Sequence, residues 1–490
     1  MLDLISAHGD KILLRDSAGE YTGRDLLEAG GAVSRLLGDR RGQRIALLAP
    51  PGLPYVAGMT GIWQSGAACV PLCPAHPAAE LEHVIRDSEV SVVLVQENMS
   101  ALLPHSVSAM VSELPEGRTE PGNAAPEPES DAMILYTSGT TGKPKGAVHT
   151  HRSIRAQIDC LLQAWAWTAQ DRILHFLPLH HTHGIVNKLF CSLAAGARCD
   201  MLPSFDAAET WNRLETGDYT IFMAVPTIYA KLISKWEEAD DATKKRWSSA
   251  CGKLRLVVSG SAALPVPVLE KWKMISGHIL LERYGMTEIG MALSNPLRGE
   301  RRPGFVGLPL PTVRVRVVDE QDRDITAEGC AGELQVAGPA VFRAYWSNPA
   351  ATEKSFTAGE NGVSWFRTGD MVCIEKGYFK IAGRLGTDII KTGGYKVSAI
   401  EIEDVLLKHA AIAECAVIGL PDETWGERVT AVIVTKKDRS VTLDELKNFA
   451  KQELAPYKIP TLLKSVETLP RNAMGKTMKG ELRKLFNDPI

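Results

Sequence analysis

The segment Tyr136-Thr-Ser-Gly-Thr-Thr-Gly-Lys-Pro-Lys-Gly146 decides how the first half of this chain is interpreted. It follows the apolar run Met133–Tyr136, typical of a buried strand, and precedes the helical pattern of Ser153–Leu162. Small residues let backbone N–H groups approach anionic oxygens, hydroxyls add donors, and Lys145 adds positive charge. The spacing is not that of a Walker A loop, and a flexible turn is the plain alternative. We expect this segment to bind phosphate.

Alternating strand and helix patterns extend on both sides of this segment. Short apolar runs at Ile45–Leu48, Val90–Gln96 and Leu254–Ser259 are typical of buried strands, and helical patterns lie between them. Such alternation predicts an α/β architecture with largely parallel sheets covered on both faces. After about residue 310 the pattern changes, because Val313–Val317 alternates strictly, as a half-exposed antiparallel strand does.

The C-terminal part of the chain has a third pattern. Ser398–Glu401 and Thr442–Glu445 have the sequence of capping boxes, and Pro456 is expected to stop the second helix. Two strand-like runs, Cys415–Leu420 and Val429–Thr435, lie between the predicted helices. We therefore predict a compact α+β unit here, with its boundary near Arg384–Asp388.

Composition narrows the classes of function. The chain has 490 residues, 45% hydrophobic and 23% charged, with a formal net charge of -3. These values are ordinary for a globular protein and argue against a dedicated nucleic-acid binder or a polybasic membrane binder. Proline and glycine divide the longest uncharged stretch, Ile45–Ala75, so we expect no membrane span.

Cysteine usage and the N-terminus suggest a compartment. The 9 cysteines form no CxxC pair, which favours free, buried thiols in a reducing environment. The first ten residues carry early acids and lack the basic region of a signal peptide and the arginines of a transit peptide. We expect a cytoplasmic protein.

Further motifs follow the phosphate segment in a fixed order: Pro178–Gly184, Val258–Leu264, Arg283–Glu288, Trp365–Asp370, Gly383–Arg384 and Pro470–Lys476. Together they resemble the adenylate-forming superfamily, which includes acyl-CoA synthetases, luciferases and the adenylation domains of nonribosomal peptide synthetases. The resemblance covers essentially the whole chain. It implies a large N-terminal domain, 1–384, of two α/β subdomains plus a small β-barrel, followed by a mobile α+β domain, 385–490.

The resemblance implies an ATP site, because the first half-reaction joins a carboxylate to the α-phosphorus of ATP and releases pyrophosphate. Residues implied to hold the β- and γ-phosphates are Thr137, Ser138, Gly139, Thr140, Thr141, Gly142 and Lys145. Residues implied at the adenosine are Gly260, Ser261, Ala262, Tyr284, Gly285 and Met286, with Asp370 and Arg384 at the ribose.

The same resemblance implies the catalytic groups. Lys476 would bridge the attacking carboxylate and the α-phosphate, and Thr287 would donate to that phosphate. Glu288 would bind Mg²⁺, a hard cation that prefers carboxylate oxygen. His181 belongs to the family's substrate motif and is the fourth residue that the resemblance implies to be catalytic. Its crowding with other histidines could suggest zinc, but no cysteine or carboxylate stands beside them at ligand spacing, so we expect no metal there.

The second half-reaction forms the thioester, and the family's C-terminal domain rotates between the two steps. Gly393, Gly394, Tyr395 and Lys396 are implied to line the pantetheine tunnel for coenzyme A. The hinge is expected at Asp388 or Thr387, but the segment around it looks one residue longer than in luciferases. No carrier-protein domain is present in the sequence, so free coenzyme A is the expected acceptor.

Among acyl-CoA synthetases, Glu282–Gly299 and Asp388–Ala399 most resemble the malonyl-CoA synthetases, including the group called acyl-CoA synthetase family member 3. Arg283 would then bind the distal carboxylate of malonate, with His183 as a second donor and Met291 as an apolar wall. The plain alternative is an Arg283 paired with Glu282 or a surface acid.

Three readings of function stay open at this point. They are a malonyl-CoA or methylmalonyl-CoA synthetase that serves fatty acid metabolism, a synthetase for another short or aromatic acid, and a non-catalytic nucleotide-binding module. The expected partners are small molecules only, with no nucleic acid, and the protein is expected to be a monomer or a homodimer.

Overall fold

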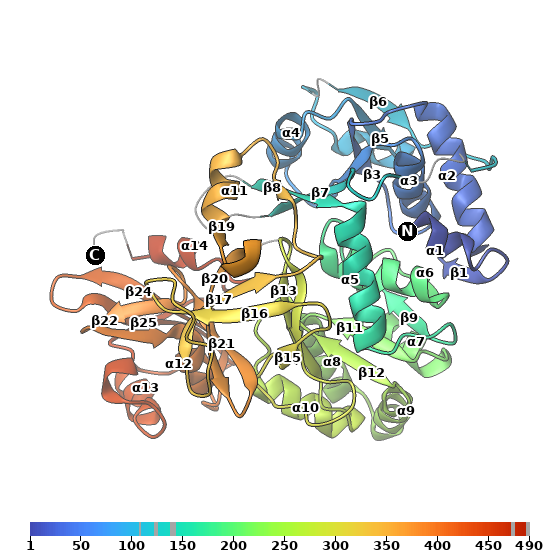
Figure 1. The fold of residues 1–490 in the computed structure, drawn as a ribbon. Helices are drawn as coiled ribbons and strands as arrows, with labels where there is room; N and C mark the ends of the chain where they lie inside the picture. Colours follow the sequence, from blue (N-terminus) through green and yellow to red (C-terminus); the bar gives the residue numbers. More distant parts are fainter. Residues whose placement is uncertain (107–108, 122–125, 138–143, 472–475, 487–490) are drawn as a thin grey trace.

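The computed structural model describes residues 1–106, 109–121, 126–137, 144–471 and 476–486. Two mostly parallel sheets form the first part of the molecule, and two smaller sheets form the rest (Figure 1). The structure confirms the predicted α/β class. The strands expected from short apolar runs are all present, and the cysteines are free thiols, although Cys330, Cys373 and Cys415 are only partly buried.

The first sheet has seven strands, and the neighbours from β7 to β6 run parallel. In spatial order its strands are β18 (Ala344–Tyr345), β8 (Lys145–Thr150), β7 (Asp131–Thr137), β4 (Ala68–Pro71), β3 (Arg44–Leu48), β5 (Val92–Val95) and β6 (Met110–Glu113). Its helices are α2 (Gly23–Leu37), α3 (Leu53–Gln64) and α4 (Ala78–Asp87), with the 3-10 turn η1 (Glu97–Leu102).

The second sheet has nine strands and is parallel from β13 to β1. In spatial order its strands are β15 (Leu308–Pro309), β14 (Gly290–Ser294), β13 (Leu281–Met286), β12 (Leu256–Ser259), β11 (Ile221–Ala224), β9 (Arg172–His175), β10 (Arg198–Met201), β1 (Ile12–Arg15) and β2 (Glu20–Thr22). Its helices are α1 (Leu2–Ser6), the π-helix η2 (His183–Phe190), α6 (Cys191–Ala195), α7 (Ala207–Thr216), α8 (Pro226–Glu238), α9 (Asp241–Gly252) and α10 (Val266–Ser276).

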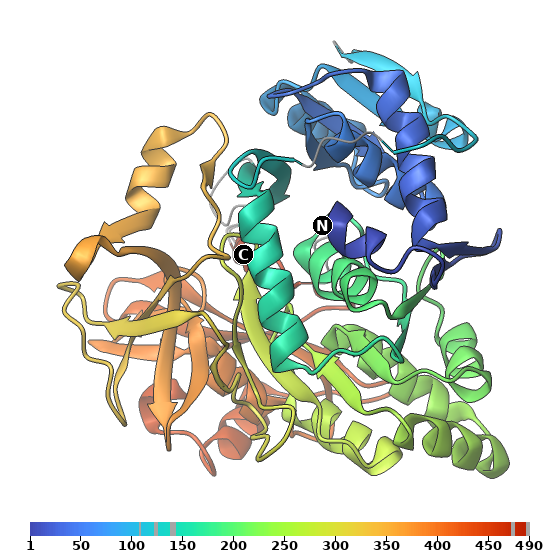
Figure 2. The same cartoon turned by 45° about the vertical axis from the view of Figure 1, so that its right-hand side comes forward.

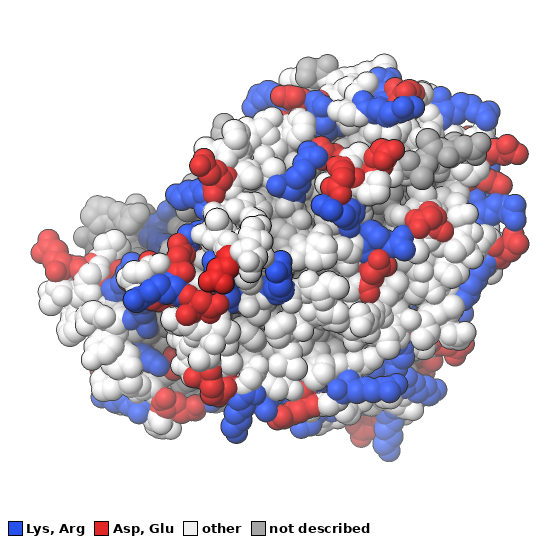
Figure 3. All heavy atoms as spheres, in the orientation of Figure 1, with Lys and Arg blue, Asp and Glu red and all other residues white. Residues whose placement is uncertain are grey.

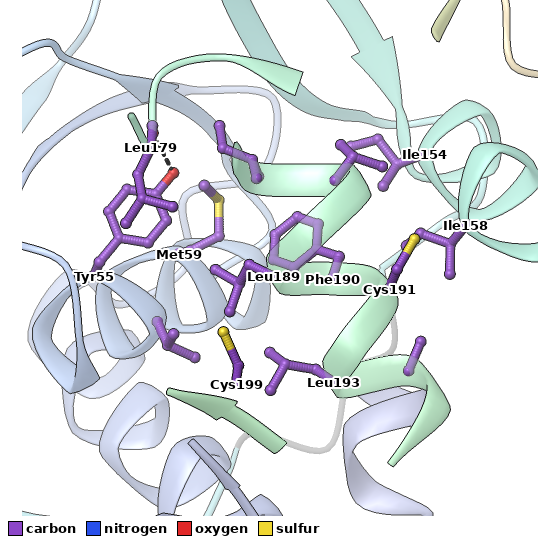
Figure 4. Packing of buried hydrophobic residues seen from close by; sticks show 14 of the residues in the cluster. Tyr55, Met59, Ile154, Ile158, Leu179, Leu189, Phe190, Cys191, Leu193 and Cys199 are labelled. Carbon is purple, nitrogen blue, oxygen red and sulfur yellow. Dashed lines mark hydrogen bonds between the residues drawn. The ribbon is translucent and has the colours of Figure 1, made fainter. Parts of the chain in front are cut away.

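A shared core joins the two sheets. Helix α5 (His151–Ala164) runs between them, as the views in Figures 1 and 2 agree, and its Ile154 and Ile158 are buried. Figure 4 shows Tyr55 of α3 in the same cluster, where its hydroxyl donates to the Leu179 carbonyl over 2.7 Å. This bond fixes the loop that carries the predicted substrate motif to a helix of the first sheet.

A five-stranded antiparallel sheet follows, in the place of the expected small β-barrel. Its members are β16 (Arg314–Val318), β17 (Ala331–Ala337), β20 (Ser364–Glu375), β19 (Phe356–Ala358) and β21 (Tyr378–Arg384), with α11 (Pro349–Ser355) and the turn η3 (Glu360–Gly362) alongside. Val317, Phe366 and Val372 fill its core, because alternate residues of such strands face one side.

The last sheet contains β23 (Tyr395–Ser398), β22 (Ile389–Thr392), β25 (Gly426–Thr435), β24 (Ile412–Asp422) and β26 (Leu462–Ser465). Its helices are α12 (Ala399–Leu406), α13 (Leu443–Ala450) and α14 (Lys479–Lys484), with the turn η4 (Pro456–Lys458). This sheet has a hydrophobic core of its own around Ile402, Leu406 and Leu446. The boundary between 1–384 and 385–490 stays a prediction.

Two local predictions need correction. Ser398 accepts a hydrogen bond from the Glu401 amide, but the Glu401 carboxylate pairs with Lys458 Nζ at 2.6 Å, so only half of that capping box forms. Both halves form at Thr442. Helix α13 ends at Ala450, before Pro456 could stop it.

Charged side chains of both signs are interspersed on the face drawn in Figure 3. That face therefore carries no extended field of one sign. Among the described residues, none of the helices has the length and apolar character needed to cross a bilayer.

Candidate active site

The predicted site lies where loops leave the carboxyl ends of parallel strands in the second sheet. Ser261 follows β12, Arg283 and Tyr284 are the two central residues of β13, and His183 begins η2 in the connection after β9. Adjacent parallel strands bring such loops to one edge of a sheet, which is where ligands of open α/β sheets bind.

Arg283 is buried, with 4% of its surface exposed. Its Nη2 donates to the Ser261 hydroxyl over 3.2 Å, while its Nε is buried with no hydrogen-bond partner. No carboxylate pairs with this guanidinium within the part of the chain that the structure describes. Burial lowers its pKa to about 10, so the side chain stays cationic at neutral pH. A buried cation without a counter-ion is costly and favours an anionic ligand.

The backbone beside Arg283 leaves room for its guanidinium. A Cβ on Gly260 would lie 2.6 Å from Cζ of the guanidinium, so any larger residue there would displace the side chain. Ser261 adopts φ 71°, the left-handed region that few non-glycine residues occupy. His183 Nδ1 lies 3.1 Å from the Ser261 hydroxyl, and His183 Nε2 is buried without a partner. Arg283, Ser261 and His183 therefore form one polar group.

Glu282 does not pair with Arg283. Successive residues of a strand point to opposite faces, and the Glu282 carboxylate accepts from the Gly304 amide over 2.9 Å. Burial raises the pKa of Glu282 to about 8, so this carboxyl is mostly protonated at neutral pH. The simple alternative of an Arg283–Glu282 pair is therefore not what the structure contains.

The residues predicted at the ribose and adenine lie together. The Tyr284 hydroxyl donates to Asp370 Oδ2 over 2.6 Å, and Arg384 Nε lies 3.7 Å from Asp370 Oδ1. Asp370 comes from β20 and Arg384 from the end of β21, directly opposite in the ladder. Burial raises the pKa of Asp370, although Arg384 and the Tyr284 hydroxyl oppose that change.

Glu288, the predicted magnesium ligand, is buried just after β13. Its Oε1 accepts from the Tyr345 hydroxyl over 2.8 Å, and Lys145 Nζ lies 4.9 Å from the centre of the same tyrosine ring. Sequence interpretation missed Tyr345, because a lone tyrosine in a two-residue strand carries no signal of its own. It links the predicted metal ligand to the predicted phosphate lysine.

Lys476 is electrostatically coupled to this pocket. Desolvation lowers its pKa, the positive charges of Arg384 and Arg283 lower it further, and Asp370 and Glu288 act in the opposite direction. Burial lowers the pKa of His181 to about 4, and His76 and Lys476 contribute to that shift. The predicted catalytic lysine therefore shares a region of concentrated positive charge with residues from β13 and β21.

The predicted tunnel residues lie elsewhere. Gly393, Gly394, Tyr395 and Lys396 are exposed at the β22–β23 turn. Tyr395 is 54% exposed and stacks on Tyr457, with ring centres 4.2 Å apart. The structure does not bring these residues to the pocket around Arg283.

The structure places some of the remaining predicted residues and leaves others outside the described ranges. Ser138, Gly139, Thr140, Thr141 and Gly142 lie outside the described residues, but Thr137 and Lys145 pair across β7 and β8 on either side of them. Gly285 packs against Met291, since a Cβ there would lie 2.5 Å from Met291 Cε. Ala262 is exposed in the loop after β12, Met286 is the last residue of β13, and Thr287 follows it.

The histidine loop has neighbours that the sequence interpretation missed. Cys73 and His76, from the connection after β4, offer ligand atoms that lie with one of His180 within 4.8 Å of one another. Both residues are distant from His180 along the chain, so no ligand spacing in the sequence relates them to it. No signal in the sequence connected these segments, because the contact exists only where the two sheets meet.

Comparison with known proteins gives the class. The model of the AMP-binding enzymes matches residues 4–346, and that of the AMP-binding enzyme C-terminal domain matches residues 401–476. The chain belongs to the family of AMP-binding enzymes, which confirms the resemblance to adenylate-forming proteins.

Three similar proteins show which members of the family this chain resembles. The chain is 46% identical to the bovine (Bos taurus) malonate–CoA ligase ACSF3, mitochondrial, over 98% of this chain and 89% of the relative. It superposes on ATP-bound MatB from Rhodopseudomonas palustris with a TM-score of 0.90, 32% identity and 99% of each chain covered. A malonyl-CoA ligase ternary product complex with methylmalonyl-CoA and AMP gives a TM-score of 0.72 and 35% identity, covering 96% of this chain and 100% of that one.

Proposed function

We propose that this protein is an AMP-forming acid–thiol ligase that converts malonate, ATP and coenzyme A to malonyl-CoA, AMP and pyrophosphate through an acyl-adenylate. The observation that carries the proposal is the buried Arg283 guanidinium, which no described carboxylate neutralises. Malonate keeps one carboxylate after the other is activated, and a guanidinium binds a carboxylate through two parallel hydrogen bonds. The names of the relatives support the same substrate.

The first step needs two anions to approach each other, so the surrounding charge must be positive. Lys476 would bridge the attacking carboxylate and the α-phosphate, because it shares the pocket with Arg283 and Arg384. Asp370 would accept from the ribose hydroxyls, since an ionised carboxylate offers only acceptor sites. Its bond from Tyr284 would hold that tyrosine in place beside the adenine.

The pocket also fits a magnesium ion, which the family reaction requires. Glu288 presents a buried carboxylate whose one described hydrogen bond comes from a neutral hydroxyl, so oxygen lone pairs stay available for a hard cation. Bound there, the ion would supply positive charge to the phosphates. Tyr345 would orient the carboxylate through its bond to Oε1.

The second step would use a different arrangement of the domains 1–384 and 385–490. The chain superposes better on the ATP-bound relative, with a TM-score of 0.90, than on the thioester product complex, with 0.72. This difference supports an arrangement suited to adenylation. Rotation at Asp388 or Thr387 would then bring Gly393–Lys396 to the pocket for attack by the thiol of free coenzyme A.

Methylmalonate is the second substrate we propose, since the product complex named above holds methylmalonyl-CoA. Met291 would allow for the methyl branch, because its flexible thioether side chain adapts to small changes of shape. We retain the cytoplasm as the proposed compartment and fatty acid metabolism as the proposed role, although the bovine relative is named mitochondrial. Fractionation of the source cells with an antibody to this chain tests the compartment.

Arg283→Met tests the substrate assignment. The change should lower kcat/KM for malonate, by an amount that corresponds to about 2–5 kcal/mol of activation free energy, because it truncates one partner of a buried ion pair. The kcat/KM for butyrate should stay the same or rise. Pyrophosphate release measured over a panel of acids, with and without coenzyme A, gives both values. It also separates this proposal from a ligase for other acids and from a non-catalytic protein.

Glu282→Gln is the matched control for this experiment. It alters the neighbouring residue on the opposite face, keeps an acceptor for the Gly304 amide, and replaces a carboxyl that is mostly neutral at pH 7. Malonate turnover should therefore stay close to that of the parent protein. A parallel loss of malonate and butyrate turnover in Arg283→Met would make Arg283 structural and remove the support for malonate.

A further inference from the structure

A cluster of potential metal ligands lies where the first and second sheets meet. Cys73 Sγ and one ring nitrogen from each of His76 and His180 lie within 4.8 Å of one another. Within the described residues this is the one group of three or more such side chains that could hold a metal ion. The proposed ligation reaction assigns no role to Cys73, His76 or His180, although His180 lies within the Pro178–Gly184 motif.

The burial of these side chains points to a ligand. His180 is 8% exposed and its Nε2 is buried without a hydrogen-bond partner, which is costly for a polar ring atom. Cys73 is 4% exposed. The His76 side chain is 25% exposed, so the cluster opens to solvent on that side and a cation has a route into it.

The surroundings provide an outer shell. Glu80 Oε2 lies 3.4 Å from His76 Nδ1, which leaves the other ring nitrogen of His76 available. Metal-binding histidines usually donate their second N–H to a carboxylate in this manner, which fixes the ring and raises its affinity for the metal. The His180 ring contacts that of His181 with centres 4.1 Å apart and planes tilted by 51°, so its orientation is also restrained.

Both segments are held by the fold rather than by each other. Cys73 follows β4, whose strand pairs with β3 in the first sheet, and His180 follows Leu179, whose carbonyl accepts from Tyr55 (Figure 4). Three ligand atoms on independently anchored segments form a partly preorganised site, which lowers the entropy lost when a cation binds.

We propose that Cys73, His76 and His180 form a zinc site. A thiolate and two imidazoles suit Zn²⁺, which binds N and S ligands tetrahedrally, and do not suit the hard cations Mg²⁺ and Ca²⁺. Binding would release the Cys73 thiol proton to solvent and form one Zn–S and two Zn–N bonds, with water in the fourth position. The site lies beside the ring of His181 and is separate from Glu288, the proposed magnesium ligand.

Metal binding to the full-length, metal-free protein tests this proposal. Zn²⁺ affinity is measured by competition with a chromogenic chelator, and Co²⁺ serves as the spectroscopic probe, because thiolate ligation gives a near-ultraviolet charge-transfer band. The parent protein should bind one equivalent and show the band. Cys73→Ser should weaken binding at least about 100-fold, more than loss of an outer-shell partner does, and remove the band.

Cys330→Ser is the control, since Cys330 is a partly buried free thiol outside the cluster. It should leave both the affinity and the band unchanged. His180→Gln keeps the thiol and should also weaken Zn²⁺ binding, which covers the case in which Cys73→Ser does not fold. Equal Zn²⁺ affinity in the parent and Cys73→Ser, or a Co²⁺ complex without the thiolate band, overturns the proposal.

Discussion

The pocket around Arg283 and the turn between β22 and β23 differ in burial and in their polar contacts. The pocket is buried and cationic, and it joins side chains from three sheets through short polar contacts. The turn is exposed, and Gly393 and Gly394 occupy it with φ of 56° and 80°. Both regions are predicted to serve one reaction, and we therefore expect them to serve it at different times.

The segment that connects them is also structured. Asp388 Oδ2 accepts from the Arg384 amide over 3.1 Å, and its Oδ1 lies 2.6 Å from Lys479 Nζ. Lys479 also lies 2.7 Å from Glu403 Oε1. A rotation near Asp388 would have to rearrange these ionic contacts. In the arrangement that these contacts stabilise, the pocket is assembled and the turn lies outside it.

The largest effect should come from blocking that rotation. Asp388→Pro fixes φ and removes an N–H that donates to the Arg384 carbonyl over 2.9 Å. Pyrophosphate release and acyl-adenylate should persist, while acyl-CoA should not form, as measured by chromatography of both products.

Asp388→Ala is the control for the proline variant, because it removes the carboxylate and its contacts with Lys479 but leaves the backbone free. It should retain much more acyl-CoA formation. Unchanged acyl-CoA formation in Asp388→Pro would place the hinge elsewhere, such as at Thr387.

Lys476→Ala should have the opposite effect: it should impair adenylation and spare thioester formation. The variant loses positive charge between two anions, and adenylation should fall roughly 10²-fold or more. Thioester formation from supplied malonyl-adenylate should persist, since that step is assigned to Gly393–Lys396. Single-turnover assays of each step give the two rates.

Lys464→Ala provides a comparison for Lys476→Ala, because Lys464 is a partly exposed lysine of β26 that donates to the Leu485 carbonyl. Neither step should change in it. If Lys476→Ala lowered both rates equally, the division of labour between the two regions would be wrong.

The smallest effect should come from adding bulk to the exposed turn. A Cβ on Gly394 meets nothing within 4 Å, so Gly394→Val should leave adenylation unchanged. After rotation the side chain would narrow the tunnel, and thioester formation should fall about 10-fold, close to 1.4 kcal/mol. The rate of acyl-CoA formation at saturating malonate measures it.

Gly329→Val controls for backbone strain, since Gly329 has φ 76° and equally open surroundings in the turn between β16 and β17. Both substitutions should lower stability by about 1–2 kcal/mol, because β-branched residues avoid positive φ. A similar loss of thioester formation in both variants would mean that strain, and not the tunnel, is responsible.

Local sequence predicted most of the elements correctly. The strands at Ile45–Leu48 and Leu254–Ser259 were identifiable because a run of apolar residues bounded by turn residues has few other stable uses. The capping box at Ser398 failed in part, because Glu401 has a stronger partner in Lys458, which is distant in sequence. Local patterns compete with contacts that only the folded chain provides.

The candidate site was predictable to the extent that its residues lie in motifs. Arg283, Asp370 and Lys476 could be named because each stands in a recognisable segment, and the structure relates all three to one pocket. Tyr345 and Cys73 could not be named, since neither residue type nor spacing distinguishes them from ordinary core residues.

The sequence by itself determined the class of fold, the family and the chemical types at the site, because these depend on periodicity and on motifs within a few residues. Only the tertiary structure decided that no carboxylate among the described residues pairs with Arg283, that Glu282 turns away from it, and that Cys73 meets His180. The physical reason is that burial and charge pairing are sums over neighbours in space. Those neighbours come from other strands, loops or sheets and cannot be located from position along the chain.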